Sequence, residues 1–421
     1  DDFLNILPSE QVHLFPVDEV LSAEMAFSSP EARADRVSAL NFLMTANAGI
    51  VVVPVAGLRK YLPTKETWQN AQLHWEIGTE VEPEILAQRL VLMGYERQSM
   101  VGKPGEFSIR GSIVDVYPLN AEYPVRVELF DVEIDSIRYF EADTQRSLEN
   151  LEEVTISPMT DLVFSKADMN HGMTRLQDAL EKRLATAKDQ TETDFLEEYF
   201  GQLLSSWEQG IPTENAHYYT DFLYQQKTTL LDYLPENSLL FVDDYSRMME
   251  TEREIAREEA EWQTLKIEEM RVFSEQTFGV DFHDQLRKTA RNTTFFSLFQ
   301  KGMGNLRFQE VHNFQYRSMQ QFFGQMPLLK AEVDRWQKQN QTVVVFVPTK
   351  ERIQKVEELF QDFDIPSVVS NWDQLLDGHV QIVQGALQTG FELPKNKLVA
   401  ITEKEIFHTT TKKRARRQTI S

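Results

Sequence analysis

Alternating hydrophobicity between Phe107 and Phe140 constrains the fold of this chain more than any other sequence feature. Three runs, FSIRGSIVDVYP, VRVELFD and DSIRYF, alternate apolar with polar side chains, and the loop LNAEYP joins the first two. Successive side chains of a β-strand point to opposite faces, so each run predicts a strand with one buried face. The amphipathic pattern EPEILAQRLVLMGYE precedes them and predicts a helix. We therefore predict a compact antiparallel sheet with one helix over residues 73–158.

Continuous apolar runs lie on both sides of this alternating segment. Ile50–Val53 follows the pattern SPEARADRVSALNFLM, which predicts a helix with Ser29 as N-cap and Pro30 at its first position. The run QTVVVFVPT near the end of the chain precedes the helical pattern KERIQKVEELFQDF. Continuous apolar strands are typical of parallel sheets that are buried on both faces. Both flanking regions therefore read as α/β, with a mainly helical stretch over residues 159–265.

Length and composition restrict the class of protein. At about 150 residues per domain, 421 residues predict two to four domains. A net charge of −23 disfavours binding to a phosphate backbone, so any role in DNA biology is expected to depend on contacts with proteins. The absence of cysteine excludes disulfides and thiolate sites. No apolar run long enough for a membrane span and no signal peptide is present, so we expect a cytoplasmic protein. Since the chain begins with Asp rather than Met, we expect a fragment.

Motifs for phosphate or metal chemistry are missing. No GxxxxGK[ST] string occurs, and in MVGKPGE a proline follows the lysine. The histidines are scattered, so no metal site is predicted. FVDDYS resembles the acidic strand end of a nucleotide site, where a carboxylate handles Mg²⁺. Without a P-loop partner the favoured interpretation is that Asp243 and Asp244 cap the following helix.

At RGSIVDVYP, VRVELFDVEIDSIRYF and DTQRSLE the chain resembles the N-terminal UvrB-homology module of the bacterial transcription-repair coupling factor (Mfd) family. A second match, GALQTGFELPKNKLVAITEKEIF, resembles the end of the third domain of that module. The middle, LLDYLPENSLLFVDDYSR, matches more loosely. The two specific matches occur in the order of the family and together cover most of the chain.

The resemblance implies a multidomain α/β layout. It implies one degenerate RecA/helicase-like domain of UvrB type, an inserted antiparallel α+β domain that binds UvrA, a small α/β third domain, and a basic linker, KKRARRQ, toward a polymerase-interacting domain. The corresponding ranges are 1–72 with 159–265, then 73–158, 276–405 and 406–421. The basic cluster is interpreted as a linker, the alternative being contact with DNA phosphates or an acidic partner.

The resemblance also implies how the work is divided within the family. This piece is expected to be non-catalytic and to hold no cofactor, because the acidic motif is altered and no P-loop lies in the chain. ATP, Mg²⁺, double-stranded DNA and RNA polymerase are expected to bind downstream domains of an ATP-dependent DNA translocase that displaces the polymerase. The alternative is an ATP-dependent, damage-verifying enzyme of UvrB type. A C-terminal domain is expected to mask the UvrA site.

Family binding positions fall on Arg110, Arg126 and Phe130, with Glu128 as a weaker candidate. Arg126 and Phe130 are four apart, so both project from one strand face about 13 Å apart. The pattern by itself favours a different interpretation, in which Phe130 packs under the helix at 83–93 or against a neighbouring domain and the arginines pair with Glu128, Asp131 or Asp135. The resemblance reverses this preference and predicts an exposed surface of two arginines and one aromatic ring.

Overall fold

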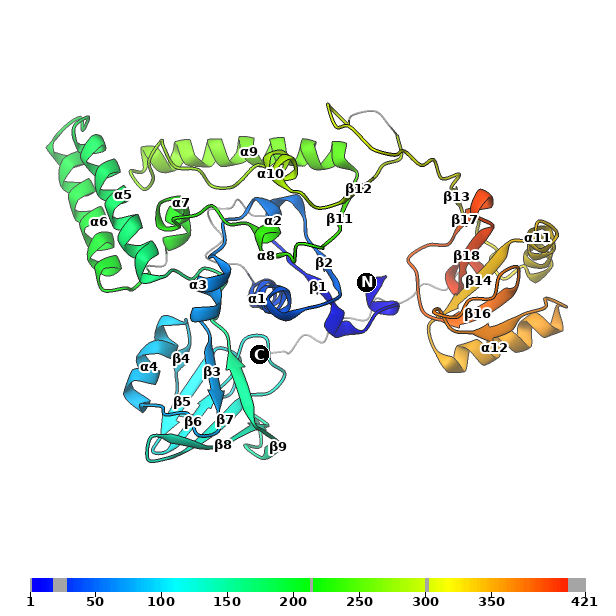
Figure 1. Cartoon of the computed structure of the whole chain (residues 1–421), viewed down its shortest axis with the longest axis horizontal. Helices are drawn as coiled ribbons and strands as arrows, with labels where there is room; N and C mark the ends of the chain where they lie inside the picture. The colour runs from blue at the N-terminus through cyan, green and yellow to red at the C-terminus, as the bar shows by residue number, and fades with distance from the viewer. Residues whose placement is uncertain (1, 18–28, 213–214, 300–302, 408–421) are drawn as a thin grey trace. The chain divides into compact units, whose positions relative to one another are not determined.

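The computed structural model describes residues 2–17, 29–212, 215–299 and 303–407 (Figure 1). The chain divides into two compact units, one of residues His13–Asn305 and one of Asp1–Val12 with Leu306–Ser421. Each unit has hydrophobic cores of its own. The basic cluster of the predicted linker lies outside the described residues.

The larger unit begins with short elements around one longer helix, namely β1 (Val12–Leu14), α1 (Pro30–Thr45), β2 (Ile50–Val52), α2 (Val55–Arg59) and α3 (Lys65–Asn70). The predicted helix start is confirmed, because the Ser29 hydroxyl accepts a hydrogen bond from the backbone N–H of Ala32 and Pro30 is the first helical residue. The prediction for Ile50–Val53 was wrong in its burial. β2 pairs with β1 in a two-stranded sheet, and Val52 is exposed.

The inserted segment contains β3 (Leu73–Glu76), α4 (Pro83–Leu92), β4 (Glu96–Arg97), β5 (Glu106–Arg110), β6 (Ile113–Val116), β7 (Val125–Phe130), β8 (Glu133–Phe140), β9 (Ser147–Leu151) and β10 (Glu153–Ile156). Strands β4 to β9 form one sheet in sequence order, antiparallel from β5 onward, while β10 pairs with β3. The predicted antiparallel sheet with one helix is therefore confirmed.

One face of the inserted sheet packs on α4, as Figure 1 shows. Val125, Val127 and Leu129 of β7 share a buried cluster with Leu86 and Leu90 of the helix. Burying an aliphatic side chain of this size contributes about 1.5–3 kcal/mol relative to leaving it exposed. The alternation of β7 therefore sends its odd-numbered residues into the core and its even-numbered residues to the opposite face.

Helices dominate the rest of the larger unit, which contains α5 (Lys166–Leu184), α6 (Gln190–Glu208), η4 (Ala216–Tyr219), α7 (Thr220–Leu223), α8 (Leu230–Tyr233), β11 (Leu240–Asp243), α9 (Tyr245–Glu268), α10 (Phe282–Lys288) and β12 (Thr293–Phe296). Strands β11 and β12 pair in parallel. Residues 276–305 consequently belong to the larger unit, whereas the predicted third domain began at 276.

The smaller unit contains η1 (Phe3–Asn5), η2 (Ser9–Gln11), β13 (Arg317–Ser318), α11 (Met326–Lys338), β14 (Thr342–Val347), α12 (Lys350–Asp362), β15 (Val368–Ser370), β16 (Val380–Gln384), β17 (Phe391–Leu393), η5 (Pro394–Asn396), β18 (Leu398–Thr402) and α13 (Glu403–Phe407). Its sheet order is β13-β17-β18-β14-β16-β15. The predicted buried strand is β14, every residue of which is buried between parallel neighbours. Asn5 Nδ2 donates to the carbonyl of Ala386 at 3.1 Å, so the first residues join this unit rather than the first predicted domain.

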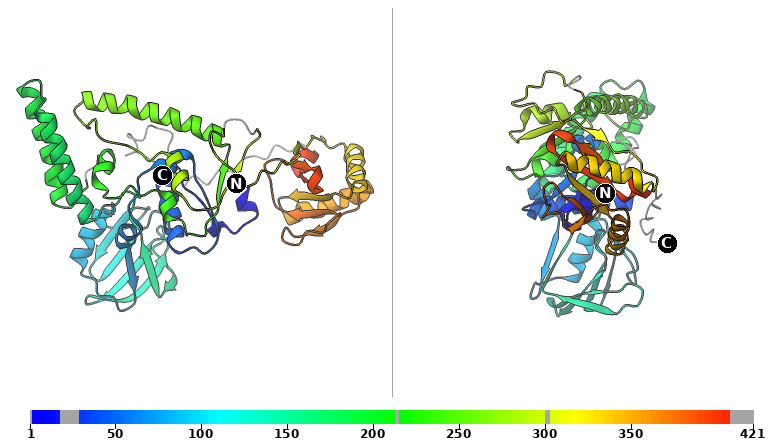
Figure 2. Two further views of the ribbon diagram at one scale, coloured as in Figure 1. Left: turned by 45° about the horizontal axis from the view of Figure 1, so that its top comes forward. Right: turned by 90° about the vertical axis from the view of Figure 1, so that its right-hand side faces the viewer.

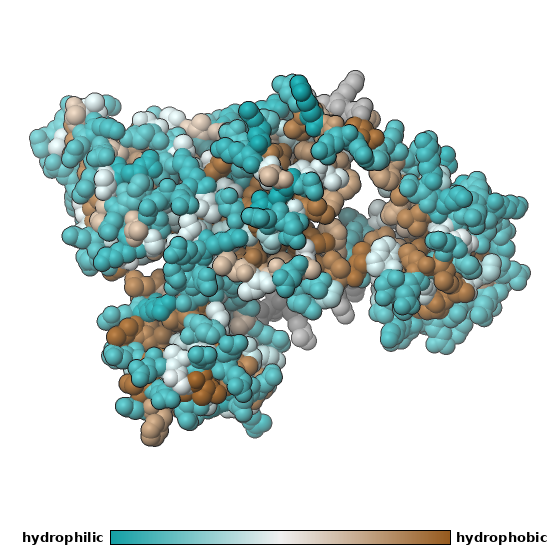
Figure 3. Space-filling view, in the orientation of Figure 1, coloured by the Kyte–Doolittle hydropathy of each residue, from teal (hydrophilic) through white to brown (hydrophobic). Residues whose placement is uncertain are grey.

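The sheet of the inserted segment and the sheet of the smaller unit are also visible in the turned views of Figure 2. Figure 3 shows that the visible surface is mostly hydrophilic and that apolar residues form separate patches. Among the helices of the described residues, none combines the length and apolarity needed to cross a membrane.

Candidate partner-binding surface

Two tight turns lie at the same end of the inserted sheet. Gly111 and Ser112 connect β5 to β6, and Asp131 and Val132 connect β7 to β8. The first residue of each turn has a positive φ, 61° at Gly111 and 58° at Asp131, as two-residue hairpin turns require. The predicted first run is therefore a hairpin rather than one strand, and β6 lies between Arg110 and β7.

Phe130 lies at the tip of the second hairpin. Its side chain is on the face opposite α4, and the residue is 79% exposed. The interpretation in which this ring packs under the helix is therefore wrong. A benzyl ring so exposed beside a turn buries little apolar surface within the fold, which makes it a candidate contact for another molecule.

Arg126 is not exposed, in contrast to the surface that the resemblance predicted. Its side chain is 11% exposed, and its Nε and Nη2 donate to the two oxygens of Asp115 at 2.7 and 2.9 Å. Nη2 also donates to Gln145 Oε1 at 2.8 Å, and the guanidinium lies 4.2 Å from the centre of the Phe140 ring. The hydrogen bonds to Asp115 raise the pKa of Arg126. Arg126 is therefore a buried residue that stabilises the sheet, not an exposed group available to a partner.

Arg110 is the more accessible of the two arginines. Its side chain is 42% exposed and donates through Nη2 to Asp115 Oδ2 at 2.9 Å. In the sheet, Arg110 pairs with Ile113, which pairs with Glu128 on β7. Arg110 and Phe130 therefore lie at the same end of the sheet, each beside a turn. We call Arg110, Glu128 and Phe130 the hairpin-end surface.

Glu128 is partly exposed but already has a partner. It accepts a hydrogen bond from Arg138 on β8, and the Ser136 hydroxyl donates to it at 3.4 Å. The hydrogen bond from Arg138 lowers the pKa of Glu128 below its ordinary value. This carboxylate is thus ionised and oriented at neutral pH, beside Phe130.

Asp115 was missed in the sequence. It is the common partner of both arginines and is completely buried. Part of the signal was available, because a turn at Gly111 and Ser112 pairs Arg110 with Ile113 and so puts Asp115 two residues farther along the same face. The pairing of Asp115 with Arg126 depends on the separate register between β6 and β7. Neither arginine pairs with the acids that the pattern suggested.

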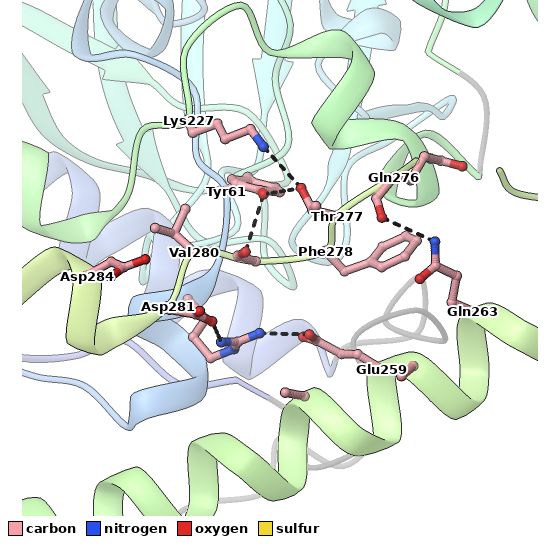
Figure 4. Close-up of a pocket in the computed structure, with 14 residues that line it drawn as sticks. Tyr61, Lys227, Glu259, Gln263, Gln276, Thr277, Phe278, Val280, Asp281 and Asp284 are labelled. Atoms are coloured by element: carbon pink, nitrogen blue, oxygen red, sulfur yellow. Dashed lines mark hydrogen bonds and ion pairs between the residues drawn. The ribbon is translucent and has the colours of Figure 1, made fainter. Parts of the chain in front are cut away.

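A cavity of about 390 Å³ in the larger unit is a second place where polar side chains meet (Figure 4). Its charged groups bind one another, since Arg59 donates to Glu252, Glu259 and Asp281 at 3.1, 2.7 and 2.7 Å. Burial raises the pKa of Glu259 although Arg59 opposes the shift. Lys227 donates to Thr277 at 3.1 Å. The bonds from Arg59 to Glu252 and Glu259 hold α9 against α2.

One group of potential metal ligands occurs among the described residues. His74, Glu76 and Glu153 have ligand atoms within 4.8 Å of one another on the β3–β10 pair, and all three are exposed. His74 Nε2 lies 3.3 Å from a Glu153 oxygen, and its Nδ1 lies 3.1 Å from the Thr155 hydroxyl. The group lies on the surface of a two-stranded ribbon.

Of the two acids in FVDDYS, Asp244 performs the predicted capping role and Asp243 does not. Asp243 ends β11, and Asp244 is the N-cap of α9 with φ of 51°. The Asp244 carboxylate accepts a hydrogen bond from the backbone N–H of Arg247 at 3.3 Å. A negative charge at this position also interacts favourably with the positive end of the helix.

Comparison with known proteins gives two family matches and several relatives. The UvrB interaction domain model matches residues 73–162, which carry the hairpin-end surface, and the MFD, D3 domain model matches residues 318–406. A transcription-repair-coupling factor of Bacillus subtilis (strain 168) is 39% identical over 422 residues, covering 100% of this chain and 36% of that protein. Those of Staphylococcus haemolyticus (strain JCSC1435) and Staphylococcus aureus (strain MRSA252) are 33% and 32% identical and cover 99% of this chain.

The chain spans about a third of the length of the curated relatives that it matches. One family model matches the inserted sheet, the other matches the small α/β unit, and the relatives match along the whole chain. This chain is therefore similar along its whole length to part of the transcription-repair-coupling factors, and it matches the UvrB interaction and MFD D3 domain models.

Proposed function

We propose that this chain is the part of a transcription-repair-coupling factor that recruits UvrA, and that the hairpin-end surface is the contact. The single observation that carries the proposal is Phe130, an aromatic side chain that is 79% exposed within the segment matched by the UvrB interaction domain. Recruitment of UvrA would hand a site where RNA polymerase has stalled to nucleotide excision repair.

The chemistry of the surface suits a protein partner. Aromatic and arginine side chains carry most of the binding energy in protein interfaces, typically about 2 kcal/mol or more for each hot-spot residue. Arg110 keeps unused N–H donors after its bond to Asp115, because a guanidinium has five. On a chain of net charge −23, such a donor favours an acidic group on the partner.

Replacing Phe130 or Arg110 by alanine is expected to weaken UvrA binding by about 30-fold each, the equivalent of about 2 kcal/mol. Phe130→Ala removes only an exposed ring, so its thermal unfolding should match that of the unmodified chain. Affinity for purified UvrA is measured by calorimetry or biolayer interferometry at a fixed salt concentration.

Phe314→Ala is the matched control, since Phe314 is also well exposed but lies in the other unit. It should leave the affinity unchanged. Unchanged affinity for both Phe130→Ala and Arg110→Ala would remove the hairpin-end surface from the proposal.

For the whole protein we propose the activity implied by the resemblance. The remaining domains would form an ATP-dependent DNA translocase that binds double-stranded DNA, displaces RNA polymerase and holds ATP and Mg²⁺, while this cytoplasmic module stays non-catalytic. Residues 13–72 and 159–305 would be a degenerate RecA/helicase-like domain, which the parallel β11–β12 pair, with α9 in the connection between its strands, supports. A C-terminal domain would cover the hairpin-end surface until UvrA is needed.

One observation favours a second function, an ATP-dependent enzyme of UvrB type. Asp243 and Asp244 lie at the end of a parallel strand, where nucleotide-binding folds place a Mg²⁺ carboxylate. Because Asp244 caps α9 and the chain has no P-loop motif, we expect no ATP hydrolysis. Phosphate release with ATP and Mg²⁺ should equal that of an Asp243→Asn, Asp244→Asn variant. Turnover that this variant abolishes would establish the enzyme instead.

A further inference from the structure

Asp115 is an ionisable residue buried within a protein-binding face. It lies on β6, on the face of the sheet opposite α4, and is 0% exposed. Its two oxygens accept three hydrogen bonds, two from Arg126 and one from Arg110. Burying a charge is costly unless it is paired and hydrogen-bonded, and here both neighbouring strands supply the pairing.

The two arginines differ in what else they contact. The guanidinium of Arg126 makes four contacts, two with the Asp115 oxygens, one with Gln145 and one with the ring of Phe140. Gln145 is itself fixed, because its Nε2 donates to the carbonyl of Ala142 at 2.7 Å. Arg110 has the bond to Asp115, and its side chain is 42% exposed. Arg126 is therefore an anchor, and Arg110 is the group that can meet a partner.

We infer that Asp115 is a positioning residue of the UvrA-binding surface, which rests on the proposed function. Its carboxylate, kept in place by Arg126, holds Arg110 in one orientation on the sheet face that also carries Phe130. A free arginine side chain samples many rotamers and loses that freedom on binding. An arginine that is oriented before UvrA arrives avoids much of this loss, and the remaining N–H groups point to a carboxylate or carbonyl of the partner.

Asp115→Asn tests this role, because the amide keeps the shape but can no longer accept from both arginines as an anion. We expect about fivefold to tenfold weaker UvrA binding, the size of effect associated with ordering one long side chain. The measurement is repeated in two backgrounds. With Arg110→Ala, Asp115→Asn should cause no further loss, and with Phe130→Ala its effect should multiply.

The different effects of Asp115→Asn in the two backgrounds distinguish a role in positioning Arg110 from a loss of folded protein. A purely structural defect would lower the affinity by the same factor in both backgrounds, and that result would overturn the inference. Asp135→Asn, at an exposed position on β8, is the matched control and should bind like the unmodified chain.

Arg110→Lys provides a test that does not depend on Asp115→Asn folding. Lysine keeps the charge but cannot form the planar guanidinium contact, so binding should approach that of Arg110→Ala. Binding by Arg110→Lys that equals the unmodified chain would contradict positioning. If instead Phe130→Ala and Arg110→Ala both bind normally, the proposed function fails, and the two failures are thereby distinguished.

Discussion

Replacing Asp161 by asparagine is expected to lower the free energy of unfolding of the larger unit by about 3 kcal/mol, the low end for breaking a buried ion pair. Asp161 is almost completely buried just after the inserted sheet. Its Oδ1 accepts from Arg36 Nε at 3.0 Å, and its Oδ2 lies 3.3 Å from Lys60 Nζ. The variant would leave the buried Arg36 without its carboxylate, which is the source of the cost.

The effect of this variant is expected to depend on pH. Burial by itself would raise the pKa of Asp161, but the charges of Lys60 and Arg36 outweigh it and hold the pKa of the carboxyl well below its usual range. A carboxyl whose pKa is lower in the folded than in the unfolded state stabilises the folded protein at pH values above the unfolded-state pKa, which is about 3.9 for Asp. This stabilisation is lost as the pH falls toward the folded-state pKa. The difference between the unmodified chain and Asp161→Asn should therefore be full at pH 7 and shrink below about pH 4.

Native-state hydrogen exchange is the suitable measurement, because it reports the stability of each segment. In a chain with several cores, a single unfolding midpoint would combine their separate transitions. Exchange should accelerate in α1, which carries Arg36, and in residues 157–163. Asp178→Asn, at an exposed position of α5, is the matched control. Equal protection in α1 for Asp161→Asn and the unmodified chain would contradict the prediction.

Arg126→Ala is the second large effect, and it should reduce stability and UvrA binding together. The substitution removes two of the three hydrogen bonds to the buried Asp115 and the contact with Phe140. We expect a loss of about 3 kcal/mol in unfolding free energy, at the low end for a buried pair because Arg110 remains bound to Asp115. Hydrogen exchange in β6 and β7, measured beside UvrA affinity, reports both changes.

Comparison with Phe130→Ala distinguishes a residue that only contacts UvrA from one that also stabilises the sheet. Phe130→Ala should lose affinity with no loss of protection, whereas Arg126→Ala should lose both. Arg146→Ala, an exposed arginine in the segment between β8 and β9, is the control for removal of a positive charge. Protection of β6 and β7 that survives Arg126→Ala would show that the buried network does not hold the sheet.

Local sequence patterns predicted the elements that depend on local chemistry. Ser29 and Pro30 placed the start of α1, the alternation of β7 placed Val125 and Val127 in the core, and the apolar run of β14 marked a buried strand. Each of these signals comes from the residue's own geometry or from its own preference for water or core.

Pairings between distant segments were predicted less well. Ile50–Val52 pairs only with β1 among the described strands and stays partly exposed, although its composition is that of a buried strand. Residues 276–305 join the larger unit because β12 pairs with β11, more than 45 residues earlier in the chain. No local preference specifies such a partner, since backbone hydrogen bonds are the same for every strand.

The sequence by itself determined which face of β7 each side chain occupies, because a strand has a period of two. It therefore placed Arg126 and Phe130 together on one face, and the structure shows that this is the face away from α4. Only the tertiary structure decided that the ring of Phe130 stays in solvent while Arg126 is buried against Asp115 and Phe140. The physical reason is that exposure and charge pairing depend on the neighbouring strands, and the turn at Gly111 inserts β6, with its buried carboxylate, between the two arginines.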